Sequence, residues 1–208
     1  MRRIIAIEGN IGSGKTTLFD LLRNRPALSS VFFIEEPVGL WETIRDETTG
    51  ESLLQRFYAD PGRYAFAFQT MAFFSRLALL NKSPDGCILV TERSLLTDRD
   101  VFAKMLHDSG KIDDLCYKVY LHNSASFVDV APNKIIYVKT EPLCCEERIV
   151  RRNRCGESDI SIEYLRQCDE YHEAMVRNAT SEVLELDGNR EICLDALDII
   201  EKFILEIN

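Results

Sequence analysis

Short runs of apolar, β-branched residues alternate along the chain with longer segments whose apolar residues recur at helical spacing. Five such runs predict strands at residues 4–8, 31–35, 87–91, 134–139 and 183–187. Each run is nearly continuous in apolar residues, which is typical of strands that are buried on both faces of a sheet. Because helical patterns separate the strands, we expect an α/β fold with a parallel sheet and crossover helices.

The segments between the strands predict the helices. These helices are expected at residues 15–24, in two segments between 40 and 82, between 97 and 129, and at 141–152, 162–178 and 192–206. Pro61 suits the first turn of a helix, and Asp60 suits its N-cap. The 208-residue chain has no internal repeat or low-complexity linker, so a single domain over residues 1–208 is expected.

Composition narrows the classes of partner. The chain has 25 basic and 34 acidic residues, and a net charge of −9 disfavours binding to the phosphate backbone of a nucleic acid. Its cysteines have no metal-ligand spacing and suit reduced thiols, while His107, His122 and His172 are isolated and suit surface or helix positions. The sequence has no signal-peptide pattern and no apolar run long enough to span a membrane. We therefore expect a cytoplasmic protein that binds neither nucleic acid nor a membrane.

A phosphate-binding motif lies between the first predicted strand and the first predicted helix. Residues 9–16 match GxxxxGK[ST], in which backbone N–H groups and the helix N-terminus surround phosphate oxygens. Lys15 would reach the β- and γ-phosphates of a nucleoside triphosphate, and Thr16 would bind Mg²⁺. The residues assigned to this loop are Gly9, Asn10, Ile11, Gly12, Ser13, Gly14, Lys15, Thr16 and Thr17. The motif does not identify the phosphoryl acceptor, because many reactions use the same loop.

Charged residues at the ends of the next two strands indicate the acceptor. Glu36 follows the second strand, and Pro37 stops that strand, so the carboxylate should face the phosphate loop. A carboxylate there can take a proton from an attacking hydroxyl, whereas it would repel an acceptor that already carries a phosphate. After the third strand, Glu92 is placed to bind Mg²⁺ directly or through water, and Arg93 to steady the transferring phosphoryl group.

An aromatic segment at residues 58–76 suits a flat ligand. Gln69 and Arg76 are seven residues apart and share a helical face with Ala72, on the side where Phe68 can stack on a ring. The amide of Gln69 is suited to the edge of a nucleobase.

A basic cluster near residues 150–160 predicts a short lid that folds over a nucleoside triphosphate. Arginines of such a lid can neutralise the charge that develops during phosphoryl transfer. The cluster consists of Arg148, Arg151, Arg152 and Arg154, followed by Gly156 and Glu157.

These motifs, in this order and over nearly the whole chain, resemble the deoxynucleoside kinase family. The resemblance is carried by residues 7–17, 36–38, 41, 68–70, 75–76, 92–94, 98–99, 102, 148–154 and 163–165. It implies a three-layer P-loop kinase fold of a compact bacterial or viral type. It also implies ATP as phosphate donor with Mg²⁺, the 5′-hydroxyl of a deoxynucleoside as acceptor, and a homodimer formed through helices within residues 61–82 and 97–129.

The resemblance further implies a role for each matching residue. Glu36 resembles the general base, although Glu92 is an alternative, and Tyr58 with Glu157 resembles the pair that holds the 3′-hydroxyl. Residues 187–192 resemble a loop that contacts the adenine of ATP, which Arg148, Arg152 and Arg154 would clamp. Gln69 would contact the base within walls formed by Val38, Trp41, Leu54, Phe57, Phe68 and Phe102.

Base preference is expected to depend on Ala72, Arg76 and Asp98. This set resembles the members that act on deoxycytidine and purine deoxynucleosides rather than thymidine. Two other readings stay open: a nucleoside monophosphate kinase of the thymidylate kinase type, and a P-loop protein that binds nucleotide without catalysis.

Overall fold

The computed structural model describes residues 2–127, 131–154, 157 and 160–206. Five strands form one parallel sheet in the order β2-β3-β1-β4-β5, which confirms the predicted sheet. The strands are β1 (Arg3–Glu8), β2 (Phe32–Ile34), β3 (Ile88–Glu92), β4 (Lys134–Lys139) and β5 (Glu182–Asp187). In the central strand, Ile7 is level with Glu92, the last residue of β3, and with Ile136 of β4, and β4 continues to Lys139.

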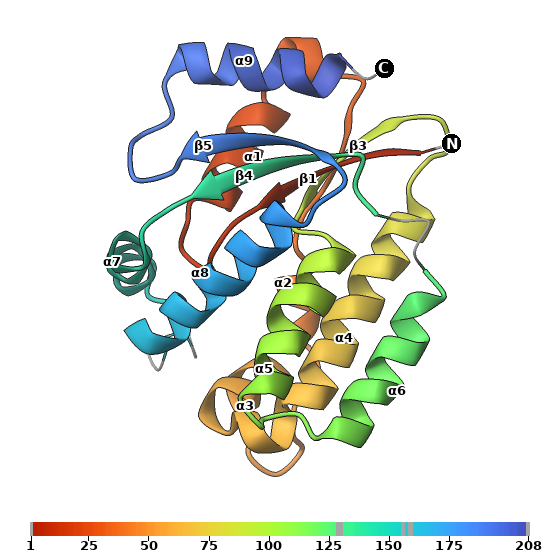
Figure 1. Ribbon diagram of the computed structural model, residues 1–208, viewed down its shortest axis with the longest axis vertical. Helices are drawn as coiled ribbons and strands as arrows, with labels where there is room; N and C mark the ends of the chain where they lie inside the picture. Colours follow the sequence, from red (N-terminus) through yellow and green to blue (C-terminus); the bar gives the residue numbers. More distant parts are fainter. Residues whose placement is uncertain (1, 128–130, 155–156, 158–159, 207–208) are drawn as a thin grey trace.

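Helices cover both faces of the sheet and make the predicted three layers (Figure 1). They are α1 (Lys15–Arg23), η1 (Pro26–Leu28), α2 (Val38–Trp41), α3 (Leu53–Ala59), α4 (Pro61–Lys82), the π-helical η2 (Thr97–Ala103), α5 (Lys104–Asp108), α6 (Asp114–Ala125), α7 (Pro142–Arg152), α8 (Ile162–Arg177) and α9 (Leu194–Leu205). Among the described residues, none of these helices is both long and apolar enough to cross a membrane.

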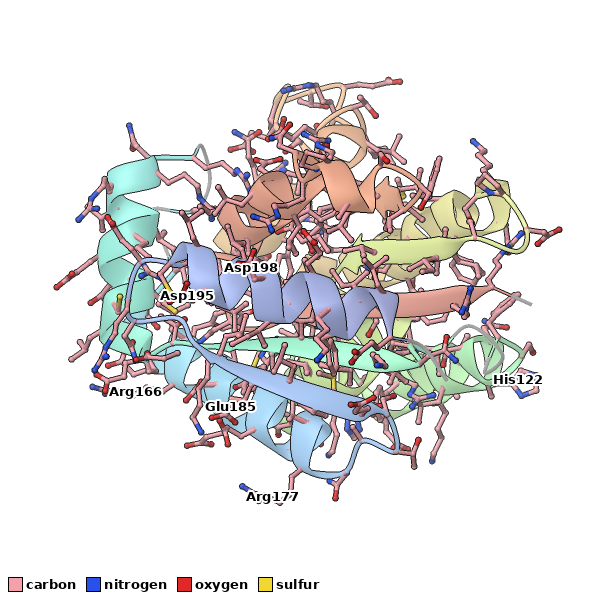
Figure 2. All side chains as sticks on the ribbon, turned by 90° about the horizontal axis from the view of Figure 1, so that it is seen from above. His122, Arg166, Arg177, Glu185, Asp195 and Asp198 are labelled. Carbon is pink, nitrogen blue, oxygen red and sulfur yellow. The ribbon has the colours of Figure 1, made fainter. Side chains whose placement is uncertain are left out.

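The side-chain alternation of the strands divides the core between the two faces. Ile5 and Ile7 of β1 pack with Leu22 of α1 and Ile200 of α9 on one face. Ile4, which points the opposite way, packs in a second cluster that includes residues of α4. Figure 2 shows Asp195 and Asp198 on α9, and Asp198 pairs with Arg25, which lies just after α1.

The edge strands differ from the prediction. The run at residues 183–187 is not buried on both faces, because β5 is an edge strand whose residues are intermediate or exposed. β2, the other edge, has three residues rather than the predicted five, and it pairs with β3. An edge strand needs fewer apolar residues than a central one, and this difference depends on strand order.

The helical segments also differ in detail. The region 97–129 is divided into η2, α5 and α6, and its expected end at residue 129 lies outside the described residues. The predicted start of α4 is confirmed: Asp60 is the N-cap, and its carboxylate accepts a hydrogen bond from the backbone N–H of Arg63.

Candidate active site

A cavity of about 1100 Å³ lies where the strands end. Residues that follow β1, β2, β3 and β5 line it, as expected for a ligand site of an open α/β sheet. Most of the predicted site residues line this cavity. Gly9, Asn10 and Arg76 lie outside its lining, and Asn10 and Arg76 are almost fully buried.

The phosphate loop needs its glycines for two reasons. Gly12 has a φ of 78° and Gly14 a φ of 102°, both in the region that favours glycine. A Cβ atom at Gly12 would also come within 2.5 Å of the Cys145 carbonyl of α7. The loop is therefore both left-handed at these positions and packed closely against α7.

Lys15 is buried at the start of α1, and its Nζ donates to the Asn10 carbonyl over 2.6 Å. Burial and the nearby Arg93 lower the pKa of Lys15 to about 7, although Glu92 and Glu36 partly oppose this shift. The ammonium thus lies in a site where an added anion would favour its charged form.

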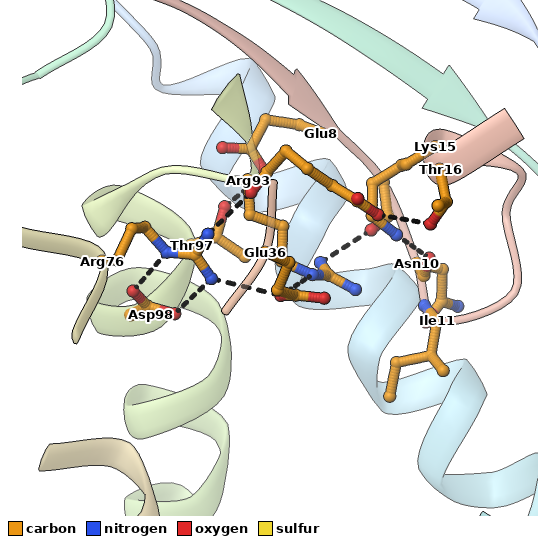
Figure 3. Close-up of polar contacts among 12 residues, drawn as sticks. Glu8, Asn10, Ile11, Lys15, Thr16, Glu36, Arg76, Arg93, Thr97 and Asp98 are labelled. Carbon is orange, nitrogen blue, oxygen red and sulfur yellow. Dashed lines mark hydrogen bonds and ion pairs between the residues drawn. The ribbon is translucent and has the colours of Figure 1, made fainter. Parts of the chain in front are cut away.

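Thr16 and Glu92 come together from α1 and β3. The Thr16 hydroxyl donates to Glu92 Oε1 over 2.7 Å, so two hard oxygen donors lie side by side. Figure 3 shows Thr16 next to Lys15. Mg²⁺ is usually held by one or two protein oxygens together with substrate phosphates, and this pair fits that need. Within the described residues, no group of three or more His, Cys, Asp or Glu side chains could hold a metal ion by itself.

Arg76 connects the base pocket with the proposed general base. Its Nε donates to Asp98 Oδ2 over 2.9 Å, its Nη1 to the Glu92 carbonyl over 2.6 Å, and its Nη2 to Glu36 Oε1 over 3.1 Å. Burial alone would lower the pKa of Arg76, but the Asp98 and Glu36 carboxylates outweigh it and raise that pKa. The guanidinium therefore stays charged between two carboxylates.

Glu36 receives a second arginine. Arg93 Nε lies 3.1 Å from the same Oε1, and no hydrogen bond or ion pair within the described residues occupies Oε2. Burial would raise the pKa of Glu36, yet Arg93, Arg76 and Lys15 together lower it. Glu36 is thus an ionised carboxylate with one oxygen fixed and the other free to accept a proton.

Arg93 is held from several sides. Its backbone φ is 65°, an uncommon value for a residue other than glycine and one that is often found at functional sites. Nη1 donates to the Gly9 carbonyl over 2.8 Å and lies 3.2 Å from His172 Nε2, and the guanidinium lies over the Phe102 ring at 4.9 Å. No partner within the described residues contacts Nη2.

The base pocket has one polar side chain without a partner. Gln69 is 2% exposed, and its Oε1 has no hydrogen-bond partner among the described residues. Phe57 and Phe68 stack at 4.6 Å, and Trp41 meets Phe68 edge-on at 5.3 Å. Trp41 Nε1 donates to Ser75 Oγ over 2.9 Å, which fixes the indole. The pocket is therefore flat-walled and apolar, with an amide available to pair with a ligand.

The residues predicted to hold the 3′-hydroxyl lie close to the arginines of the predicted lid. Arg152 and Arg154 both contact the Glu157 carboxylate, and burial together with Glu157 raises the pKa of Tyr58. Arg148 instead donates to the backbone carbonyls of Ser13, over 3.0 Å, and of Gly188, over 2.8 Å. Arg148 thus joins the phosphate loop to the start of the 187–192 segment. Residues 155, 156, 158 and 159, which include Gly156 of the predicted lid, lie outside the described residues.

One family model matches nearly the whole length of the chain. The family model for deoxynucleoside kinases matches residues 5–208. The chain belongs to the deoxynucleoside kinase family. It is therefore a phosphotransferase, and its P-loop fold and the predicted resemblance are confirmed.

Individual relatives agree with the family model. A probable deoxycytidine kinase of fowlpox virus is 34% identical, over 92% of this chain and 81% of the relative. Deoxycytidine kinase 2 of Gallus gallus is 34% identical, over 97% and 83%. A mitochondrial deoxyguanosine kinase of Xenopus laevis is 30% identical, over 96% and 82%.

Two buried groups of this deoxynucleoside kinase were not identified from sequence. Glu8 is fully buried at the end of β1 and accepts from the Thr97 hydroxyl, and burial raises its pKa. His172 lies on helix α8 as expected, but it is fully buried and contacts Arg93. The signal for His172 was its spacing: Leu165, Cys168, His172 and Met175 recur at helical intervals, and all four are buried.

Proposed function

We propose that this protein transfers the γ-phosphoryl group of ATP to the 5′-hydroxyl of a deoxynucleoside, as a nucleotide salvage kinase. One observation carries the proposal: the ionised Glu36 lies in the same cavity as the phosphate loop, with one carboxylate oxygen fixed and one free. This arrangement suits a neutral hydroxyl acceptor. It does not suit a monophosphate, whose charge Glu36 would repel.

The reaction then uses the chain's own groups as follows. Glu36 Oε2 accepts the proton of the 5′-hydroxyl as that oxygen attacks the γ-phosphorus, while the bond from the γ-phosphorus to the bridging oxygen breaks and ADP leaves. Lys15 and the backbone N–H groups of the loop hold the β- and γ-phosphates, and Arg93 offers Nη2 to the phosphoryl group in transit. Mg²⁺, held by Thr16 and Glu92, would neutralise charge on the phosphate oxygens.

Recognition of the deoxynucleoside follows from the pocket. The base pairs with the Gln69 amide and lies between Phe68 or Phe102 and the apolar wall of Val38, Trp41, Leu54 and Phe57. Tyr58 and Glu157 hold the 3′-hydroxyl. Asp98 offers an acceptor to an exocyclic amino group, so we infer a preference for deoxycytidine or a purine deoxynucleoside over thymidine. The preference rests on Arg76 and Asp98, because the relatives include deoxycytidine and deoxyguanosine kinases and also a thymidine kinase.

We also infer a homodimer. Three large apolar side chains are exposed on α4 and α6. Phe74 on α4 is 40% exposed, and Leu115 and Val119 on α6 are 73% and 45% exposed. α4 and α6 lie next to each other, so these residues can form one apolar surface (Figure 1).

A phosphorylation screen tests the function. Purified protein is incubated with labelled ATP and Mg²⁺ and, separately, with the four deoxynucleosides and their four 5′-monophosphates. We expect 5′-monophosphates from deoxycytidine, deoxyadenosine or deoxyguanosine, and less product from thymidine. Phosphorylation of monophosphates alone would indicate the thymidylate kinase type. ATP binding without transfer to any acceptor would indicate a non-catalytic nucleotide-binding protein.

A further inference from the structure

His172 is the polar member of an otherwise apolar helix face. In α8, Leu165, Cys168, His172 and Met175 point into the protein, and His172 has no exposed surface. A buried polar side chain is stable only where its hydrogen-bonding groups have partners. The partners of His172 therefore indicate why a histidine stands there.

Each ring nitrogen of His172 has a partner that fixes its proton. Nδ1 lies 2.6 Å from the Cys168 carbonyl oxygen, which can only accept, so Nδ1 carries the hydrogen. Nε2 lies 3.2 Å from Nη1 of Arg93, and a guanidinium can only donate, so Nε2 is the acceptor. The two contacts independently require the same form, a neutral imidazole protonated at Nδ1.

This acceptor completes the surroundings of Arg93. Nη1 has two hydrogens, and the Gly9 carbonyl and His172 take one each. Nε forms an ion pair with Glu36 Oε1, and the guanidinium lies over Phe102. Nη2 is the nitrogen of this guanidinium that has no partner within the described part of the chain, so its two hydrogens remain for a ligand in the cavity.

The helix that carries His172 is also tied to the phosphate loop. Asn10 Nδ2 donates to the Leu165 carbonyl over 2.8 Å, seven residues before His172 on α8. α8 therefore contacts the phosphate loop through one residue and Arg93 through another. This double attachment fixes the distance between Arg93 and the loop that binds the transferred phosphate.

We propose that His172 is a positioning residue of phosphoryl transfer, which holds the Arg93 guanidinium by accepting from Nη1 so that Nη2 faces the phosphoryl group. The expected effect on kcat rests on the proposed function, whereas the contact between His172 and Arg93 does not. His172 does not contact either substrate and takes no part in proton transfer.

Two substitutions separate the two contacts of the ring. In His172→Asn, the shorter amide can take the place of Nδ1 and donate to Cys168, but it leaves Nη1 of Arg93 without an acceptor. In His172→Gln, the longer amide can place an oxygen near the position of Nε2. Met175→Ala is the matched control, because it removes a buried side chain from the same helix face and leaves the contacts of Arg93 and His172 in place.

We expect His172→Asn to lower kcat about 10- to 100-fold, the range that a charge-assisted hydrogen bond is worth when the rate depends on it. The KM values for nucleoside and ATP should change little, and His172→Gln should recover most of kcat. Met175→Ala should lower the melting temperature without lowering kcat. Equal loss of kcat in the Asn and Gln variants, or no loss in either, would overturn the positioning role.

A spectroscopic measurement tests the same inference without activity. In protein labelled with ¹⁵N-histidine, long-range ¹H–¹⁵N spectra should show one ring protonated at Nδ1 that is absent from His172→Gln. A ring protonated at Nε2, or one that titrates like a free imidazole, would contradict the inference. If the wild type phosphorylates no deoxynucleoside, the proposed function fails, whereas the tautomer still reports on the contact with Arg93.

Discussion

At the scale of single residues, Glu36 is the side chain on which the proposed chemistry depends most directly. Glu36→Gln keeps its shape and removes its ability to accept a proton. We expect kcat to fall about 10²- to 10⁴-fold, the usual worth of a general base, with little change in the Kd for ATP. Steady-state kinetics and calorimetric titration with ATP measure the two quantities.

The neighbouring Glu35 provides the control for this variant. Its side chain is 61% exposed and pairs with Arg23 on the surface. Glu35→Gln should leave kcat nearly unchanged. Near-normal kcat in Glu36→Gln would exclude Glu36 as the base and leave Glu92 as the alternative.

Lys15 predicts a pH dependence of ATP binding. Its pKa is about 7 in the free protein, and bound phosphates should raise it by stabilising the ammonium. Above pH 7 the complex therefore holds more protons than the free protein, so ATP affinity should fall up to tenfold per pH unit. Below pH 7 both states are protonated, and this contribution disappears.

Calorimetric titration between pH 6 and pH 9, in buffers of different ionisation enthalpy, measures this proton uptake. Lys15→Arg is the control, because a guanidinium stays charged over this range. A pH-independent affinity in the wild type would contradict the lowered pKa of Lys15.

Arg76 and Asp98 predict how base preference can be changed. Arg76→Met together with Asp98→Ala removes both charges and leaves an apolar space suited to the 5-methyl group of thymine. We expect the ratio of kcat/KM for thymidine to that for deoxycytidine to rise. An unchanged ranking of the four deoxynucleosides would remove the specificity assignment.

At the scale of elements, the packing of the phosphate loop on α7 makes Gly12 sensitive. In Gly12→Ala the Cβ would meet the Cys145 carbonyl, and alanine would have to adopt a φ of 78°. Such backbone strain costs about 1–3 kcal/mol, so we expect a lower free energy of unfolding together with weaker ATP binding. Urea unfolding and ATP titration measure the two effects.

Gly62→Ala is the matched control. Gly62 lies in the first turn of α4, and the atom nearest to a Cβ added there is an Asp60 carboxylate oxygen at 3.7 Å. Alanine is a better helix former than glycine, so this variant should be neutral or slightly more stable. Equal destabilisation by both substitutions would mean that the contact with α7 does not constrain the loop.

The sequence predicted the central elements better than their ends. The ends of β1 and α1 that flank the phosphate loop lie close to the predicted positions. The apolar run and the glycine-rich motif are independent signals for where the strand ends and the helix begins. η2 was not predicted as a separate turn, since its π-helical spacing shifts the side chains from helical periodicity. That turn carries Thr97, whose partner Glu8 became evident only in three dimensions. Arg76 and Asp98 had been grouped from sequence, and the structure places them in contact.

In the candidate site, too, some features could be predicted from sequence and others required the structure. The positions of Glu36, Gln69 and Lys15 in the cavity lining could be predicted from a strand end, a helical face and a loop motif. The proposed role of His172 could not, because it depends on the contact with Arg93, which lies 79 residues away. A helical pattern predicts which face is buried but not which residue lies opposite.

At the scale of the whole molecule, the apolar surface on α4 and α6 predicts the oligomeric state. Leu115→Glu with Val119→Glu places two charges on this surface, and a dimer that buries it would lose stability. We expect the wild type to be a dimer and the double variant a folded monomer. Light scattering coupled to size-exclusion chromatography gives the mass of each, and circular dichroism verifies the fold.

Leu143→Glu is the control for this surface. Leu143 is 56% exposed on α7, away from α4 and α6, so its substitution should leave the dimer intact. A wild-type protein that is monomeric at all accessible concentrations would contradict the inferred homodimer.

The position of Arg76 between Asp98 and Glu36 has a consequence for how such an enzyme can diverge. If Arg76 is replaced first, Asp98 is left as a buried charge without its partner, and Glu36 loses one of the two arginines that orient it. If Asp98 is replaced first, Arg76 still donates to Glu36 and to the Glu92 carbonyl. The order of the two substitutions therefore matters: an evolutionary path to a new nucleobase is open through Asp98 and closed through Arg76.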